Sequence, residues 1–143
     1  MKVALHDINV LVALFDSNHV ESEKVWEWFG EDCRHGWATC PITENGFVRI
    51  INQPRYPNPL SPTDAIERLR QATNSKYHDF WPCSRGILDP LLLNKEMILS
   101  PRQITDGYLL GLCINFGGRL ITMDTGIQSK IVNGAKADDL VIL

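Results

Sequence analysis

Four acidic residues occupy places in the sequence where a carboxylate could take part in chemistry. Asp7 and Asp124 each end a short apolar segment, and Glu44 and Asp106 each come near the start of a helical pattern. In a parallel sheet the carboxyl ends of the strands share one edge, so these groups could meet there. Two unit charges about 4 Å apart repel by roughly 4 kcal/mol at an effective dielectric near 20, so the cluster needs protons or cations. Oxygen ligands favour Mg²⁺ or Mn²⁺, which suits phosphodiester hydrolysis.

Each acid also has a purely structural explanation. In the helical pattern "TDGYLLGLC" (105–113), Asp106 opens the helix and shares its apolar stripe, where an isolated charge is costly. A first-turn acid can simply complement the helix dipole, and an aspartate after a strand can simply form a turn. Glu44 repeats the arrangement of Asp106 on the stripe of its own helix. The four acids together favour a shared site over four separate structural roles.

The elements that must position these acids alternate along the chain. We expect strands over 2–7, 36–40, 78–82, 118–124 and 139–143, and helices over 8–15, 20–32, 43–51, 62–73 and around 105–113. Gly30 is expected near the end of the second helix, and Thr43 and Ser61 are expected to cap the third and fourth. The region 83–99 gives no definite pattern. This order predicts an α/β fold, a three-layer α/β/α sandwich with a mostly parallel central sheet, in a single domain over 1–143.

Composition and missing motifs exclude several function classes. A net charge of −3 argues against broad, charge-driven nucleic-acid binding, although basic side chains could still line an acidic centre. The four cysteines lack CxxC spacing, so we expect reduced thiols rather than zinc ligands or disulfides. No signal-peptide pattern or membrane-length apolar run is present, and we expect a cytoplasmic protein without membrane contact. The sequence has no G-x-S-x-G or P-loop motif, and its scattered histidines do not suggest a catalytic one: His6 should point to the opposite strand face from Asp7.

Four motifs in order, "HDINVLVALF", "ITENGFVRI", "QITDGYLLGLC" and "LITMDTG", give a resemblance to the PIN-domain ribonucleases, and among them to the VapC-type toxins of type II toxin–antitoxin systems. "SKYHDFWP" is similar to one branch of these toxins. The resemblance implies an Mg²⁺-dependent endoribonuclease, with Mn²⁺ as a substitute. It makes Asp7 and Asp106 the main metal ligands, with Glu44 and Asp124 completing the acidic pocket directly or through water. It also implies supporting roles for two polar residues, Asn9 and Thr122.

The same resemblance implies an RNA substrate, a cognate antitoxin protein and a homodimer. Candidate RNA contacts are Arg49, Arg55 and Arg102, each of which could instead be a solvated surface residue. Tyr56 could stack on a base or pack under its loop. Trp26 and Trp28 lie on nearly opposite sides of their helix, so one of them should be exposed, as at an interface.

Two features depart from the family pattern or lack an explanation. Thr125, Gly126 and Ile127 follow Asp124, where the family often has a basic residue and then another acid or an aromatic. Gly107 lies inside a helix, where glycine costs roughly 1 kcal/mol. Two alternatives to the nuclease stay open: a non-catalytic RNA- or protein-binding module on the same fold, and a haloacid-dehalogenase-type phosphatase with Asp7 as nucleophile. Such a phosphatase normally has a second acid where this chain has Asn9.

Overall fold

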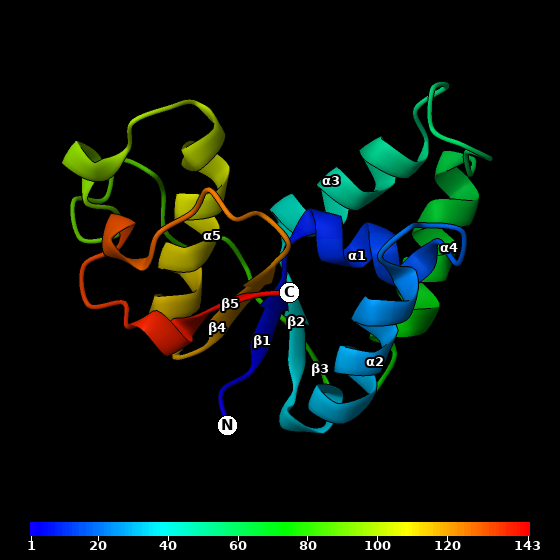
Figure 1. Cartoon of the computed structure of the whole chain (residues 1–143), viewed down its shortest axis with the longest axis horizontal. Helices are drawn as coiled ribbons and strands as arrows, with labels where there is room; N and C mark the ends of the chain where they lie inside the picture. The colour runs from blue at the N-terminus through cyan, green and yellow to red at the C-terminus, as the bar shows by residue number, and fades with distance from the viewer.

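Five parallel strands form the centre of the molecule. The computed structural model describes residues 1–143 and orders the strands β3-β2-β1-β4-β5. Their bounds are Ala4–His6 (β1), Trp37–Thr39 (β2), His78–Phe80 (β3), Arg119–Thr122 (β4) and Leu140–Ile142 (β5). Every neighbouring pair is parallel, so the carboxyl ends of all five strands lie at one edge (Figure 1). The expected sheet is confirmed.

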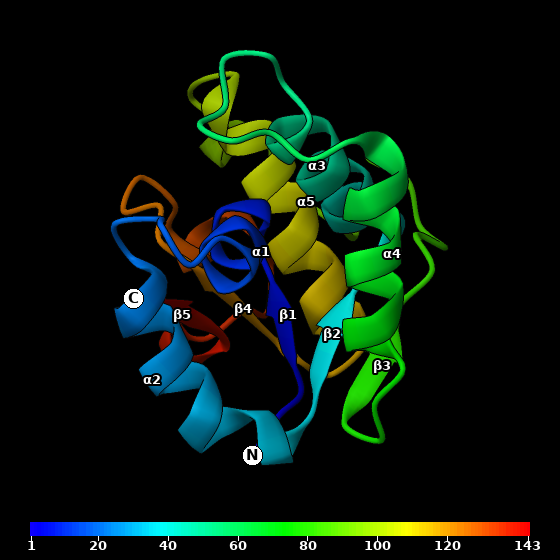
Figure 2. The same cartoon turned by 90° about the vertical axis from the view of Figure 1, so that its right-hand side faces the viewer.

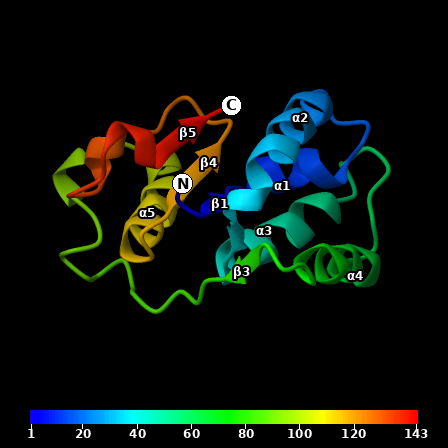
Figure 3. The same cartoon turned by 90° about the horizontal axis from the view of Figure 1, so that it is seen from below.

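Helices cover both faces of this sheet, as expected for a three-layer sandwich. One face carries α1 (Ile8–Phe15), α2 (Ser22–Asp32), α3 (Pro41–Ile51) and α4 (Pro62–Thr73), and the other carries α5 (Arg102–Asn115). Figures 1 and 3 show α5 on one side of the strands and the other four helices on the opposite side, and Figure 2 looks onto that four-helix side. None of the helices is both long enough and apolar enough to cross a membrane.

Successive side chains of β1 point to opposite faces of the sheet, so they pack against different helix layers. Leu5 packs with the α5 residues Leu109 and Leu110, while Ala4 packs with α1 and α2. His6 faces the same side as Ala4 and is fully buried. Its ring contacts those of three aromatic residues at centroid distances of 5.4–5.6 Å, namely Trp28, Phe29 and Trp37. His6 therefore points to the face of the sheet that carries α1 and α2, as the alternation along the strand predicted.

Several helix boundaries differ from the sequence-based prediction. The helix α2 continues through Gly30 to Asp32, so that glycine does not end it. The N-cap of α3 is Cys40, and Thr43 lies one turn inside the helix, where its hydroxyl accepts a hydrogen bond of 3.0 Å from the Cys40 backbone N–H. Ser61 does cap α4, accepting from the Asp64 backbone N–H at 3.1 Å.

The start of α5 matters most for the site. This helix begins at Arg102, so Asp106 is its fifth residue and not its first. The prediction that Asp106 opens the helix is therefore wrong. Dipole complementarity, which acts within the first turn, accounts poorly for a carboxylate at this position.

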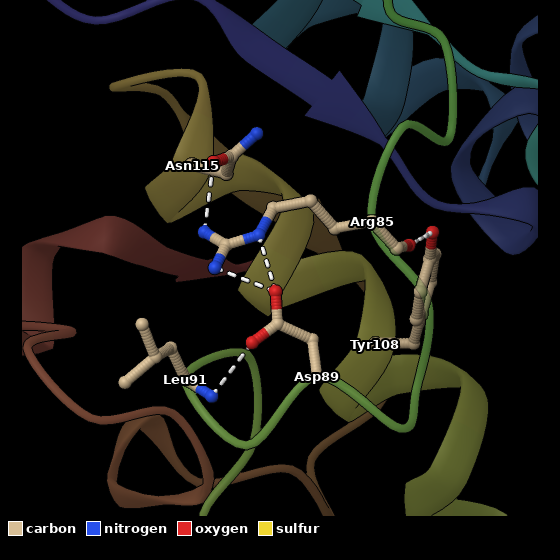
Figure 4. Close-up of polar contacts among 5 residues, drawn as sticks. All are labelled: Arg85, Asp89, Leu91, Tyr108 and Asn115. Carbon is tan, nitrogen blue, oxygen red and sulfur yellow. Dashed lines mark hydrogen bonds and ion pairs between the residues drawn. The ribbon is translucent and has the colours of Figure 1, made fainter.

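The segment between β3 and α5, which had no definite sequence pattern, is held to α5 by polar contacts (Figure 4). The Arg85 guanidinium forms an ion pair of 2.6 Å with Asp89 and donates a hydrogen bond of 3.0 Å to Asn115. The Tyr108 hydroxyl donates to the Arg85 carbonyl at 2.5 Å, and Asp89 accepts from the Leu91 backbone N–H at 2.9 Å. These contacts fix a long irregular connection against the helix that carries Asp106.

Two local features lie near the amino end of β4, opposite the edge that carries the acids. Gly117, two residues after the end of α5, has φ of +68°, a left-handed conformation that favours glycine and helps to end the helix. Arg119, at the start of β4, is almost fully buried and pairs with the buried carboxylate of Asp32. Its Nε also donates to the Lys2 carbonyl at 2.9 Å.

Candidate active site

Asp7 lies directly after β1 and caps α1. Its Oδ1 accepts a hydrogen bond of 2.7 Å from the Ile8 backbone N–H, and its Oδ2 accepts one of 2.7 Å from the Thr122 hydroxyl. Only 5% of the residue is exposed. Burial raises the pKa of Asp7, and these two hydrogen bonds partly oppose that rise. Because each carboxylate oxygen has two lone pairs, both oxygens keep acceptor capacity for another group.

Thr122 and Asn9 connect Asp7 to the end of β4. The Thr122 hydroxyl accepts from the Asp124 backbone N–H at 3.0 Å and from the Asn9 amide at 3.4 Å. The Asn9 carbonyl oxygen accepts from the Met123 backbone N–H at 3.2 Å. This network fixes the β4–loop junction relative to β1, so both residues can orient acids at this edge.

Asp106 and Asp124 form a coupled pair beside Asp7. Burial raises the pKa of Asp106 to about 7, and the charge of Asp7 and hydrogen bonding with Asp124 add to this rise. The pKa of Asp124 is lowered, first by a 2.8 Å hydrogen bond from the Gly126 N–H and then by the same contact with Asp106. Adjacent carboxylates that compete for one proton behave in this way.

A cavity of about 250 Å³ opens onto this pair, and only polar residues and glycine line it. Asp106 and Asp124 lie on its wall with Arg102, whose positive charge lowers the pKa of both acids. Of the three arginines that were candidate RNA contacts, Arg102 is the one that lines a cavity with these acids. Arg49 lies by a neighbouring cavity with Ile8. Arg55 is exposed in the loop after α3.

Tyr56, in the same loop as Arg55, packs against the α1–α3–α4 core, and its hydroxyl donates to Asp16. Of its two predicted roles, the structure shows packing under the loop.

Glu44 lines a different cavity from Asp106 and Asp124. Its Oε2 accepts a 2.7 Å hydrogen bond from the hydroxyl of Thr39, and its side chain lines a groove between α3 and α4 with Arg70. Glu44 does not contribute to the raised pKa of Asp106. Asp106 and Asp124 line one cavity with Asp7 nearby, whereas Glu44 lines the separate groove, so the convergence of four carboxylates stays a prediction.

Sequence reasoning missed the partners of Glu44. Thr39 is fully buried at the end of β2, and its hydroxyl lies 2.8 Å from Nε2 of His78 on β3. Only the signature "HDFWP" pointed to this region, and it gave no role to the histidine.

The structure accounts for Gly107, beside Asp106. A Cβ at this position would lie 2.8 Å from Ile131 Cγ2 and 3.3 Å from Leu93 Cδ2. The absence of a side chain lets α5 approach the segment after β4 closely. The glycine thereby holds Asp106 near Asp124.

The side chains of these acids offer the oxygen atoms that a hard divalent cation prefers as ligands, but they do not form a complete metal site. Carboxylate oxygens are the donors, and burial followed by the like charge of Asp7 raises the pKa of Asp106. No group of three acidic, histidine or cysteine side chains lies close enough together to hold a metal ion. A hard cation at these acids would therefore need water molecules to complete its coordination, which is the usual mode of Mg²⁺ in proteins.

An α/β/α sandwich with aspartates gathered at the carboxyl edge of its parallel sheet is the architecture expected for a PIN-like domain. No family model matches the sequence. Ribonuclease VapC44 of Mycobacterium tuberculosis is 46% identical over 140 residues, covering 98% of this chain and 99% of the relative. Ribonuclease VapC39 of the same species is 37% identical, covering 92% and 95%. The chain belongs to the VapC ribonuclease family of PIN-domain proteins.

A solved structure supports the fold. The complex VapBC2 from Rickettsia felis, bound to a DNA fragment from its promoter, contains a chain that superposes with a TM-score of 0.62 at 11% identity, covering 99% of this chain and 97% of that one. The family assignment sets aside the haloacid-dehalogenase alternative.

Proposed function

We propose that this protein is a toxin endoribonuclease that hydrolyses RNA phosphodiester bonds with Mg²⁺ held by Asp7, Asp106 and Asp124. Membership of the VapC ribonuclease family supports the nuclease assignment. The observation that carries the metal assignment is the polar cavity that Asp106 and Asp124 line together, and the raised pKa of Asp106 agrees with it. When bound, the ion would activate water for attack on the phosphodiester.

The residues around the acids have separate tasks in this proposal. Thr122 and Asn9 hold Asp7 in register with the end of β4, which is followed by Asp124. Arg102 at the wall of that cavity would attract and orient an RNA phosphate. Glu44 stays in the proposal as a fourth acid that acts through water, with its carboxylate held at the α3–α4 groove by the Thr39 hydroxyl.

The test measures cleavage of an RNA panel by the purified protein with Mg²⁺, comparing wild type with Asp106→Asn. Asp64→Asn is the matched control, because Asp64 is an exposed first-turn acid of α4 away from the cavity. We expect Asp106→Asn to lose at least about a hundredfold in rate, as for loss of a group that stabilises transition-state charge, and Asp64→Asn to keep full activity. A folded Asp106→Asn protein with undiminished cleavage would support the non-catalytic alternative instead.

The proposal includes an antitoxin partner. The superposed Rickettsia felis structure is a VapBC complex. Induced expression should therefore arrest growth, and co-expression of the small neighbouring open reading frame should relieve the arrest. Arrest that persists with that partner would contradict the pairing.

The proposal also includes a homodimer. The indole of Trp26 on α2 is about half exposed although its Nε1 donates to Leu14, which leaves an aromatic surface for an interface. Light scattering should give twice the 16.2 kDa chain mass. A mass of one chain at micromolar concentration would contradict it.

A further inference from the structure

The histidine of the "HDFWP" signature is linked to Glu44 through one buried hydroxyl. Thr39 Oγ1 lies 2.7 Å from Glu44 Oε2 and 2.8 Å from His78 Nε2. A hydroxyl has one proton to donate, and an ionised carboxylate only accepts. Thr39 therefore donates to Glu44 and accepts from the Nε2–H of His78. The three side chains form a directed chain of hydrogen bonds from β3 through β2 to α3.

Thr39 and His78 are both held by packing. Thr39 has no exposed surface, so its hydroxyl has no bulk water as an alternative partner. The His78 ring meets the buried Trp37 ring edge-on, with centroids 4.6 Å apart. Trp81, from the same signature, is buried against Phe116 with nearly parallel rings. The signature thus anchors the edge strand and aims its histidine at Thr39.

We infer that Thr39 and His78 are positioning residues for Glu44, fixing its carboxylate at the groove between α3 and α4, from which the proposed function has it act as the fourth acid. This inference rests on the proposed function. A hydrogen bond from a buried donor to a carboxylate restricts that side chain to one rotamer. Without the Thr39 hydroxyl, the Glu44 side chain becomes mobile in a groove that opens to solvent.

The test pairs each disruptive substitution with one that keeps the hydrogen bond. Thr39→Val removes the hydroxyl at nearly constant volume, while Thr39→Ser keeps it. His78→Leu removes the donor, while His78→Gln retains an amide N–H near the position of Nε2. We expect Thr39→Val and His78→Leu to lower kcat/KM by about 10- to 100-fold, the size of one hydrogen bond to a charged group. Thr39→Ser and His78→Gln should restore most of the activity.

A double-mutant cycle separates positioning from a general loss of structure. In a Glu44→Gln background, Thr39→Val and His78→Leu should cause little further loss, because their effect acts through the Glu44 carboxylate. Additive losses in that background would overturn the inference, as would Thr39→Val and His78→Leu proteins with full activity.

The role of Glu44 and the nuclease proposal are tested apart. If Glu44→Gln keeps full activity while Asp106→Asn is inactive, this inference fails and the three-aspartate nuclease stands. If Asp106→Asn is active as well, the proposed function fails too.

Discussion

The buried His6 gives a prediction whose size follows directly from its surroundings. Its two ring nitrogens are buried and have no hydrogen-bond partner. Burial lowers the pKa of His6 to about 3, and the nearby positive charge of Arg119 adds to this shift. An unfolded histidine titrates near 6.5, so below that pH the unfolded chain binds a proton that the folded protein does not. Stability must therefore fall as pH drops from about 6.5 toward 3.

The magnitude is about 1.4 kcal/mol for each pH unit below 6.5. Between pH 7 and pH 5, His6 should cost the folded protein about 2 kcal/mol of unfolding free energy. Substitution His6→Leu removes the titrating group and also removes two unpaired polar atoms, at the expense of aromatic contacts with Trp28, Phe29 and Trp37. These opposing effects should leave the variant close to wild type at pH 7.

The assay is urea unfolding of wild type and His6→Leu at pH 7, 6 and 5, with EDTA present so that metal binding does not contribute. The acidic groups titrate in both proteins, so the difference between the two unfolding free energies isolates His6. We expect that difference to shift in favour of the variant by about 2 kcal/mol from pH 7 to pH 5. Parallel curves would refute the reasoning and place a partner or water at the ring.

Three further expectations follow from named contacts. Asp106→Asn should stabilise the metal-free protein by about 1–2 kcal/mol near pH 7 after allowance for solvent screening. The raised pKa of Asp106 destabilises the fold above the unfolded pKa of 3.8, so the gain should shrink toward pH 4; equal gains at both pH values would contradict it. Gly107→Ala should destabilise by about 1–3 kcal/mol through overpacking, whereas Gly30→Ala in α2, with no atom within 4 Å of the added Cβ, should stabilise slightly; thermal melts that rank them the other way would contradict this. Arg119→Met should cost about 3–5 kcal/mol in urea unfolding because Asp32 stays buried without its partner, and a loss below about 1 kcal/mol would contradict that.

Simple periodicity was sufficient to predict the fold. Apolar runs such as "KVALH" and "RLIT" predicted the strands, and the amphipathic segments between them predicted helices that cover both faces. The placement of Asp7 and Asp124 at one edge could also be predicted, because the carboxyl ends of parallel strands share an edge, whereas Asp106 comes from the second turn of α5. The resemblance to PIN-domain toxins is confirmed by the relatives in Mycobacterium tuberculosis.

What could not be predicted depends on contacts between segments far apart in the chain. The direction of Glu44 is set by Thr39 and His78, and no local pattern links residues 39, 44 and 78. The need for Gly107 comes from Ile131, which lies beyond the next strand. The start of α5 was missed because its N-cap, Pro101, makes no side-chain capping contact that a sequence pattern would reveal.

The most direct test of the central claim is RNA cleavage by the wild-type protein before and after removal of divalent metal. We expect no cleavage in excess EDTA and recovery of the full rate when Mg²⁺ or Mn²⁺ is restored, with no recovery in Asp106→Asn under the same conditions. Undiminished cleavage by the wild-type protein in excess EDTA would contradict a metal site built from Asp7, Asp106 and Asp124.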